Sequence, residues 1–190
     1  MARTAKGSGR DNRRKILEAA MDMIGQKGVD KITLAGISKA SGISKGTLYY
    51  YYATKNDLIF DIADLHMEKI TQALFTMIDE NSRLTWERLL TAFFTTLLSS
   101  DARSRLHIYL VKEAISGNDS LKKRFQATYR QWFAMVNEAS AKMPGNIRYS
   151  DAHAKLLVAA VDGFILQTLL DTDKIKISDI VSLMLRLIES

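Results

Sequence analysis

The segment "SKGTLYYYYATK", residues 44–55, concentrates side chains that can donate hydrogen bonds to an anionic polymer. Four consecutive tyrosines, residues 49–52, follow Lys45 and Thr47 and precede Lys55. Consecutive residues on a helix point about 100° apart, so four tyrosines in a row cannot all face one core. Lysine ammonium and tyrosine or threonine hydroxyl groups bind phosphates and base edges well. The segment therefore predicts a binding surface rather than a buried helix.

Positive charge is concentrated in the first third of the chain. Residues 1–55 contain 11 Lys and Arg against 4 Asp and Glu, whereas the remaining 135 residues contain 16 basic and 17 acidic residues. A basic segment on a near-neutral body is typical of a protein with a nucleic-acid partner. A solvated basic tail would give the same counts, so the charge by itself leaves both interpretations open.

Three helical stretches must position the tyrosines. An apolar pattern from Arg10 predicts a helix that Gly28 ends. Thr33 is an expected N-cap of a second, short helix, which the Ser41-Gly42 pair interrupts. Ser44 is an expected N-cap of a third helix over residues 45–51. Two short helices joined by a tight turn that contains glycine predict a helix-turn-helix.

The third helix has an inner and an outer side. Leu48 and Tyr52 are four residues apart and share a face, so with Ile43 we expect them to pack against the other two helices. We therefore expect Tyr49, Tyr50 and Tyr51 to be exposed on the outer side of the helix. Gly46 costs a helix about 1 kcal/mol relative to alanine, and close approach of a groove wall to the backbone would explain its presence.

The rest of the chain is also helical in pattern. We expect a long helix over residues 57–80, and strand-like alternation is absent from the sequence. The sequence predicts an all-α protein of about nine helices, with further helices at about 84–99, 103–115, 119–142, 150–171 and 178–189. Pro144 lies in an expected loop. The predicted organisation is a disordered basic tail (1–9), a helix-turn-helix domain (10–56) and a second helical domain (57–190).

The first third of the chain resembles a known family. Thr33, "ISKASGIS", "GTLYYYY" and Lys55 are similar to the N-terminal DNA-binding domain of TetR-family transcriptional regulators. In that family a threonine opens the second helix, and the third carries Gly-x-Leu-Tyr-x-His-Phe before a lysine. Tyr51 stands where the family often has histidine, and Tyr52 stands where it has phenylalanine. Tyr52 therefore needs a partner for its hydroxyl group or a place at the rim of the domain.

The resemblance implies contacts to phosphates or bases for a set of residues in this segment. They are Thr33, Ser44, Lys45, Gly46, Thr47, Tyr49, Tyr50, Tyr51 and Lys55. It also implies a repressor that binds a palindromic operator in double-stranded DNA as a homodimer and is released by an unknown small-molecule effector bound to the second domain.

Two helices near the end of the chain are apolar around most of their circumference, which indicates that each has two partners to pack against. We expect one partner to be the chain's own core and the other to be a second subunit. Complete burial inside a monomer is the alternative. The residues expected at a dimer interface are Leu156, Ala160, Gly163, Phe164, Leu170, Ile180, Met184 and Leu187.

Aromatic and polar side chains on otherwise apolar helices are the candidates for the ligand pocket. They are Trp86, Phe93, His107, Tyr109, Glu113, Trp132, Met135, Asp162 and Gln167. The alternative is that they are ordinary core or interface residues. A buried Glu113 or Asp162 would favour a cationic ligand.

Composition excludes several other classes of protein. The chain has no cysteine, and its three histidines are not spaced as metal ligands, so we expect no metal and no cofactor. It lacks a phosphate-binding glycine loop and a nucleophile motif, and we do not expect an enzyme. We also expect a soluble cytoplasmic protein, because no secretory signal is present and "LLVAAVDGFILQTLL" is interrupted by polar residues and short for a bilayer. A DNA-binding architectural or constitutive factor without an inducer remains the alternative function.

Overall fold

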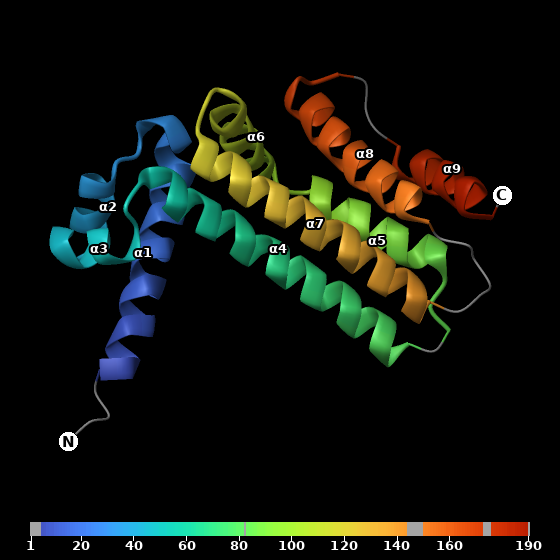
Figure 1. Ribbon diagram of the computed structural model, residues 1–190, viewed down its shortest axis with the longest axis horizontal. Coiled ribbons are helices and arrows are strands. Elements are labelled where there is room, and N and C mark those ends of the chain that lie inside the picture. Colours follow the sequence, from blue (N-terminus) through green and yellow to red (C-terminus); the bar gives the residue numbers. More distant parts are fainter. Residues whose placement is uncertain (1–4, 82, 144–149, 173–175, 190) are drawn as a thin grey trace. The chain divides into compact units, whose positions relative to one another are not determined.

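The protein is described by a computed structural model that covers residues 5–81, 83–143, 150–172 and 176–189. In these ranges the chain forms nine α-helices and one 3-10 turn, and it contains no strand (Figure 1). The prediction of an all-α protein is confirmed. The helices form two compact units, Met1–Leu65 and His66–Ser190, and helix α4 contributes to both.

The first unit is the predicted helix-turn-helix. It contains α1 (Ala5–Lys27), the 3-10 turn η1 (Val29–Lys31), α2 (Leu34–Ser41), α3 (Lys45–Tyr51) and the first turns of α4 (Lys55–Glu80). Helix α1 begins earlier than expected, so residues 5–9 are helical rather than part of a disordered tail; residues 1–4 lie outside the described part of the chain. The unit also extends past residue 56, because the first turns of α4 bury Leu58, Ile59 and Ile62 almost completely.

The turns between these helices are closed by local hydrogen bonds. The Thr33 side chain accepts from the backbone N–H of Gly36, and that of Ser44 accepts from the backbone N–H of Thr47, both at 3.1 Å. These bonds confirm both predicted N-caps. Gly42 ends α2 at a φ of 68°, a left-handed conformation that favours glycine. The caps and the turn fix where α3 begins and therefore which of its residues face outward.

The second unit is a bundle of the remaining helices. It contains the end of α4, α5 (Trp86–Leu98), α6 (Asp101–Ile115), α7 (Asp119–Lys142), α8 (Asp151–Leu169) and α9 (Ile177–Glu189). Helix α5 packs against α8 and α9, and α7 packs against α6 and α8. Their core surrounds the fully buried Phe94 and includes Leu97, Val161 and Val181. Helix bounds agree with the sequence pattern to within a few residues; the loop predicted at Pro144 lies outside the described residues.

In the described ranges, α8 is the one helix that is long and apolar enough to cross a bilayer. The sequence analysis expected this segment to be too short for a span, and its length does not exclude one. A core helix of a soluble bundle passes the same test. Here Leu157, Val161 and Ile165 are buried in the core of the bundle, and Asp162 at the centre of the helix binds partners on two other helices. These contacts hold one side of α8 against the bundle.

Candidate nucleic-acid interface and ligand pocket

The outer side of α3 carries the predicted contact surface. Tyr49 and Tyr50 are 52% and 85% exposed, whereas Leu48 and Tyr52 are buried, as their spacing predicted. Of the residues expected to contact DNA, Thr33, Ser44, Lys45, Gly46, Tyr49 and Tyr50 are exposed, and Thr47, Tyr51 and Lys55 are half-buried. Helix α3 thus presents an ammonium group and two phenolic hydroxyls to solvent. Such donors suit phosphate oxygens and the acceptors on base edges.

No packing contact of the described residues requires a glycine at position 46. A Cβ atom built on Gly46 would meet no atom of the described residues within 4 Å. The residue therefore leaves free space on the exposed side of α3, next to Lys45. Contact with DNA remains a prediction for all nine residues.

Besides the capping residues, Tyr51 and Lys55 already have hydrogen-bond partners elsewhere in the chain. The Tyr51 hydroxyl donates to the Gly9 carbonyl at 3.0 Å, and the Tyr51 ring meets that of Tyr50 edge to face at 5.4 Å. The Lys55 ammonium donates to the Val29 carbonyl at 3.3 Å. To contact a phosphate, both side chains would exchange a backbone carbonyl for a phosphate oxygen. Their positions are set before any ligand arrives.

Tyr52 has the partner that its hydroxyl requires. It donates to Asp61 Oδ2 at 2.7 Å, and Arg13 Nη2 donates to the same oxygen at 2.7 Å. Burial, followed by the bond to Asp61, raises the pKa of Tyr52, so its hydroxyl keeps its proton and remains a donor. One carboxylate on α4 thereby joins the end of α3 to α1. The need of Tyr52 for a partner was expected from the sequence, but Asp61 was not identified as that partner.

We expect Asp61→Ala to lower the free energy of unfolding by about 2–3 kcal/mol, because it leaves the buried Tyr52 hydroxyl without an acceptor. Tyr52→Phe removes the donor and its need for a partner together, so about 1 kcal/mol is expected. Arg13 is partly exposed, so water can solvate its guanidinium group in the variant, and the loss of its ion pair adds little to the change in unfolding free energy. Urea unfolding of the full chain measures both variants. Asp22→Ala, at an exposed position on α1, is the control, and an Asp61→Ala effect no larger than that of the control would contradict this role.

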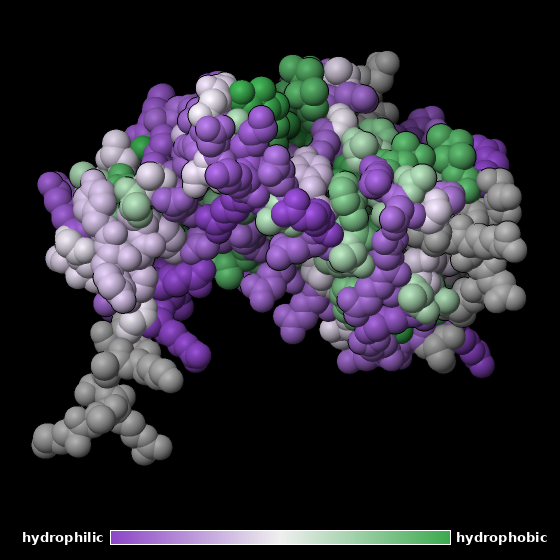
Figure 2. All heavy atoms as spheres, in the orientation of Figure 1, coloured by the Kyte–Doolittle hydropathy of each residue, from purple (hydrophilic) through white to green (hydrophobic). Residues whose placement is uncertain are grey.

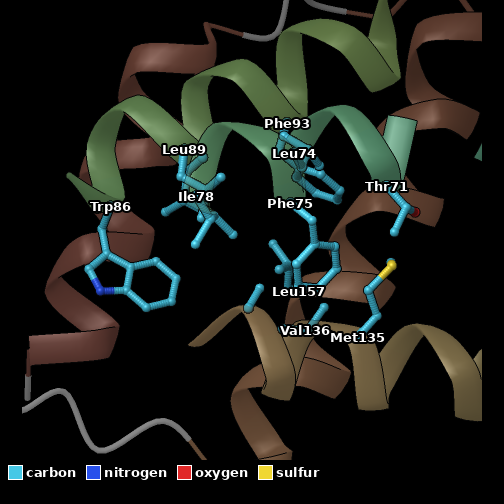
Figure 3. Close-up of a pocket in the computed structure, with 12 residues that line it drawn as sticks. Thr71, Leu74, Phe75, Ile78, Trp86, Leu89, Phe93, Met135, Val136 and Leu157 are labelled. Atoms are coloured by element: carbon cyan, nitrogen blue, oxygen red, sulfur yellow. The ribbon is translucent and has the colours of Figure 1, made fainter. Parts of the chain in front are cut away.

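The second unit contains an apolar pocket (Figure 3) with about 510 Å³ of space free of atoms, part of which opens to solvent. Trp86 lies at one end, and Thr71 and Met135 lie at the other. The described residues that line it are Thr71, Leu74, Phe75 and Ile78 of α4, Trp86, Leu89, Leu90 and Phe93 of α5, Met135, Val136 and Ala139 of α7, and Leu157 of α8.

Three of the nine predicted pocket residues line this pocket: Trp86, Phe93 and Met135. The other six lie elsewhere in the second unit: His107, Tyr109, Glu113, Trp132, Asp162 and Gln167. Gln167 is exposed near the end of α8, where its carbonyl accepts from Thr172. A role in ligand binding remains a prediction for all nine residues.

Three of these six form a polar and aromatic cluster with Tyr129. His107 Nε2 lies 3.0 Å from Asp162 Oδ1, and the Tyr129 hydroxyl donates to Asp162 Oδ2. The Trp132 ring lies 5.0 Å from that of Tyr129 and 6.1 Å from that of His107. Burial and the bond to Asp162 raise the pKa of Tyr129. Each oxygen of the Asp162 carboxylate thus has a partner within the protein, and sequence analysis missed Tyr129.

Helices α8 and α9 carry the residues predicted at a dimer interface. Leu156, Leu170 and Leu187 are exposed, and they are joined by Leu166 and Leu183, which sequence analysis missed. Ala160, Gly163, Phe164, Ile180 and Met184 are half-buried, and Phe164, Ile180 and Met184 also pack against the core. Hydrophobic side chains reach the surface over these helices in Figure 2. We call this surface, defined by Leu156, Leu166, Leu170, Leu183 and Leu187, the α8–α9 face.

Two local features suit the α8–α9 face for contact with another protein surface. His153 accepts from the backbone N–H of Ser150 through Nδ1 at 3.0 Å, so Nε2 donates to the Leu187 carbonyl at 3.1 Å and joins α8 to α9. A Cβ atom on Gly163 would meet no atom of the described residues within 4 Å. Both helices therefore present exposed apolar side chains, and α8 has room at Gly163 for close approach of another surface.

Helices α2 and α3 form a helix-turn-helix in which α3 is exposed and rich in hydrogen-bond donors, and a helical bundle follows them in the chain. This combination is typical of helix-turn-helix transcriptional regulators. Residues 16–62 match the family model "Bacterial regulatory proteins, tetR family". The first unit therefore contains the DNA-binding domain that the TetR family model describes. In the described residues no group of three His, Asp or Glu side chains could hold a metal ion.

The chain is also similar in sequence to individual transcriptional regulators. The chain is 34% identical over 70 residues to the transcriptional regulator AcrR of Shigella flexneri. This match covers 37% of this chain and 33% of AcrR. It is 28% identical over 107 residues to EthR of Mycobacterium tuberculosis, covering 54% and 50%. The chain thus matches about a third to a half of the length of these relatives.

A solved structure extends the likeness of fold over nearly the whole chain. That structure is FadR of Thermus thermophilus, a TetR-family repressor solved in complex with lauroyl-CoA. Its TM-score is 0.70 at 17% sequence identity, and the match covers 93% of this chain and 92% of FadR. At this identity the likeness describes the fold alone.

Proposed function

We propose that this protein is a DNA-binding repressor in the cytoplasm that binds a palindromic operator as a homodimer and is released by a small molecule. The observation that carries the DNA-binding part is the exposed side of α3, where Lys45, Tyr49 and Tyr50 present donors to solvent without a partner in the core. An exposed aromatic pair on a short helix is costly unless it binds something. The positive charge of the first third supports a polyanionic partner.

The α8–α9 face supports the dimer. A twofold axis through this face would bring two copies of the same apolar surface together, as symmetric dimers require. Two copies of α3 would then read two half-sites related by the same axis, which makes the preferred operator a palindrome. Helix-turn-helix dimers generally read half-sites about one helical turn of DNA apart, roughly 34–36 Å, and we expect the same spacing in this operator.

The apolar pocket supports control by a ligand. Helix α4 contributes Thr71, Leu74, Phe75 and Ile78 to the pocket, and the same helix carries Asp61, which binds the end of α3 and α1. A ligand changes DNA affinity only if it binds one arrangement of the protein better than another. A continuous helix that reaches both sites gives the ligand a means to do so.

Selection of sheared genomic DNA from the source organism by the purified protein tests the proposal. We expect enrichment of a few palindromic sites, because a dimer with fixed half-site spacing reads only such sequences. The Lys45→Ala/Tyr49→Ala/Tyr51→Ala variant is the control and should enrich none. Diffuse enrichment by both proteins would instead favour an architectural DNA-binding factor.

A further inference from the structure

The chemistry of the pocket lining restricts the ligand of the second unit. Eleven of the twelve described lining residues have no side-chain oxygen, and the exception, Thr71, lies at one end of the pocket (Figure 3). The lining carries no Asp, Glu, Lys, Arg or His among the described residues. Among the described lining residues, Trp86 and Thr71 are the two with a side-chain N–H or O–H group. The pocket therefore offers a ligand almost nothing except apolar contact.

The carboxylate that could have attracted a cation is not available to the pocket. Asp162 does not line it, and its two oxygens bind His107 and Tyr129. Glu113 does not line it either. A charged group moved from water into such a lining would lose its hydration without gaining a partner, and this cost is large. The expectation of a cationic ligand, raised for a buried Glu113 or Asp162, is therefore not supported at this pocket.

The shape of the pocket indicates an elongated ligand. Residues Thr71, Leu74, Phe75 and Ile78 follow an i, i+3, i+4, i+7 pattern along α4, and Trp86, Leu89, Leu90 and Phe93 follow the same pattern along α5. Each set spans two helical turns, about 10 Å at 1.5 Å per residue. Apolar side chains of α7 and α8 complete the lining.

We infer that the pocket binds an uncharged, largely hydrocarbon molecule with at most one polar group, extended between α4 and α5 from the Trp86 end to the Thr71 end. This inference rests on the proposed function and specifies its ligand. The affinity comes from removal of hydrocarbon from water, so it grows with the apolar area that the ligand buries.

A series of straight-chain 1-alkanols with six, eight and ten carbons tests the inference on the unmodified chain by calorimetry. At about 0.8 kcal/mol per buried methylene, affinity should rise about fourfold for each added carbon until the pocket is filled. At neutral pH, decanoate and decyltrimethylammonium should bind at least tenfold more weakly than 1-decanol because their charged groups must be desolvated. Equal affinity along the alkanol series, or tighter binding of either ion, would overturn the inference.

Tryptophan fluorescence locates the bound probe. The chain has two tryptophans, and only Trp86 lines the pocket, so Trp132→Phe leaves a single reporter in the lining. In that background 1-decanol should change the emission of Trp86. Ala139→Phe fills the pocket from α7 and should weaken decanol binding at least tenfold, whereas Ala134→Phe, at an exposed position on the same helix, should not.

The two proposals fail separately. Alkanol binding is measured without DNA, so its failure overturns the ligand class and leaves the genomic selection as the test of DNA binding. Decanol binding of equal strength in the Ala139→Phe and Ala134→Phe variants would place the ligand elsewhere and would also overturn the inference. The thermal unfolding midpoint of each variant, compared with that of the unmodified chain, shows whether it folds.

Discussion

Lys45→Ala should reduce affinity for the selected operator about tenfold to a hundredfold and should relax the preference at one base pair. Lys45 lies at the first position of α3, is exposed, and adjoins the open space at Gly46. A lysine that contacts a base edge contributes about 1–3 kcal/mol of discrimination. Binding to operators with each base pair changed in turn, at one fixed salt concentration, measures both effects.

Two controls separate base contact from the loss of a positive charge. Lys31→Ala removes the same charge from an exposed position of the first unit and should weaken binding only slightly and equally for all sequences. Tyr51→Phe should also act equally on all sequences, because it removes a contact to phosphate. If Lys45→Ala changes neither affinity nor preference, the recognition surface has been assigned to the wrong side of α3.

The second large effect is expected at the α8–α9 face. Leu166→Asp/Leu183→Asp should convert the proposed homodimer into a monomer, because each subunit would bury two new carboxylates without partners in an apolar interface. Operator affinity should fall at least a thousandfold, since a monomer reads one half-site and loses about half of the binding free energy of a specific complex. Analytical ultracentrifugation measures the first effect, and operator binding measures the second.

Ile115 supplies a matched control for the dimer prediction. It is an apolar residue at the end of α6, 79% exposed and outside the α8–α9 face. Ile115→Asp should leave both the oligomeric state and operator binding unchanged. A Leu166→Asp/Leu183→Asp variant that still sediments as a dimer would show that the subunits meet elsewhere, or that the exposed leucines do not hold them together.

The first unit was the part of the fold most open to prediction from the sequence, because its signals are local. Thr33 and Ser44 cap the helices that follow them through bonds to residues three positions away. The partner of Tyr52 is nine residues distant on another helix, and that of Tyr51 is 42 residues distant. Neither distance produces a periodic pattern, so the need of Tyr52 for a partner could be foreseen and Asp61 could not.

Pocket residues were harder to predict for a different reason. Trp86 and His107 are both amphipathic side chains on apolar helices, and the sequence gives no sign of which neighbouring helix each will meet. In the structure Trp86 lines the pocket, while His107 binds Asp162 from α8. The residues that contribute most to the pocket wall, such as Leu74, Phe75 and Leu89, have the ordinary composition of a core. A search for polar or unusual side chains passes over them.

The absence of charge from the pocket lining among the described residues also bears on what a cell could signal through it. Partition of a hydrocarbon molecule from water into lipid and its binding in this pocket depend on the same transfer free energy. That free energy is about 0.8 kcal/mol per methylene in both cases. Lengthening the molecule strengthens both equilibria together, so occupancy of the sensor would follow the load of the compound in the membrane. A repressor of this kind would report how much of a lipophilic compound the cell has accumulated.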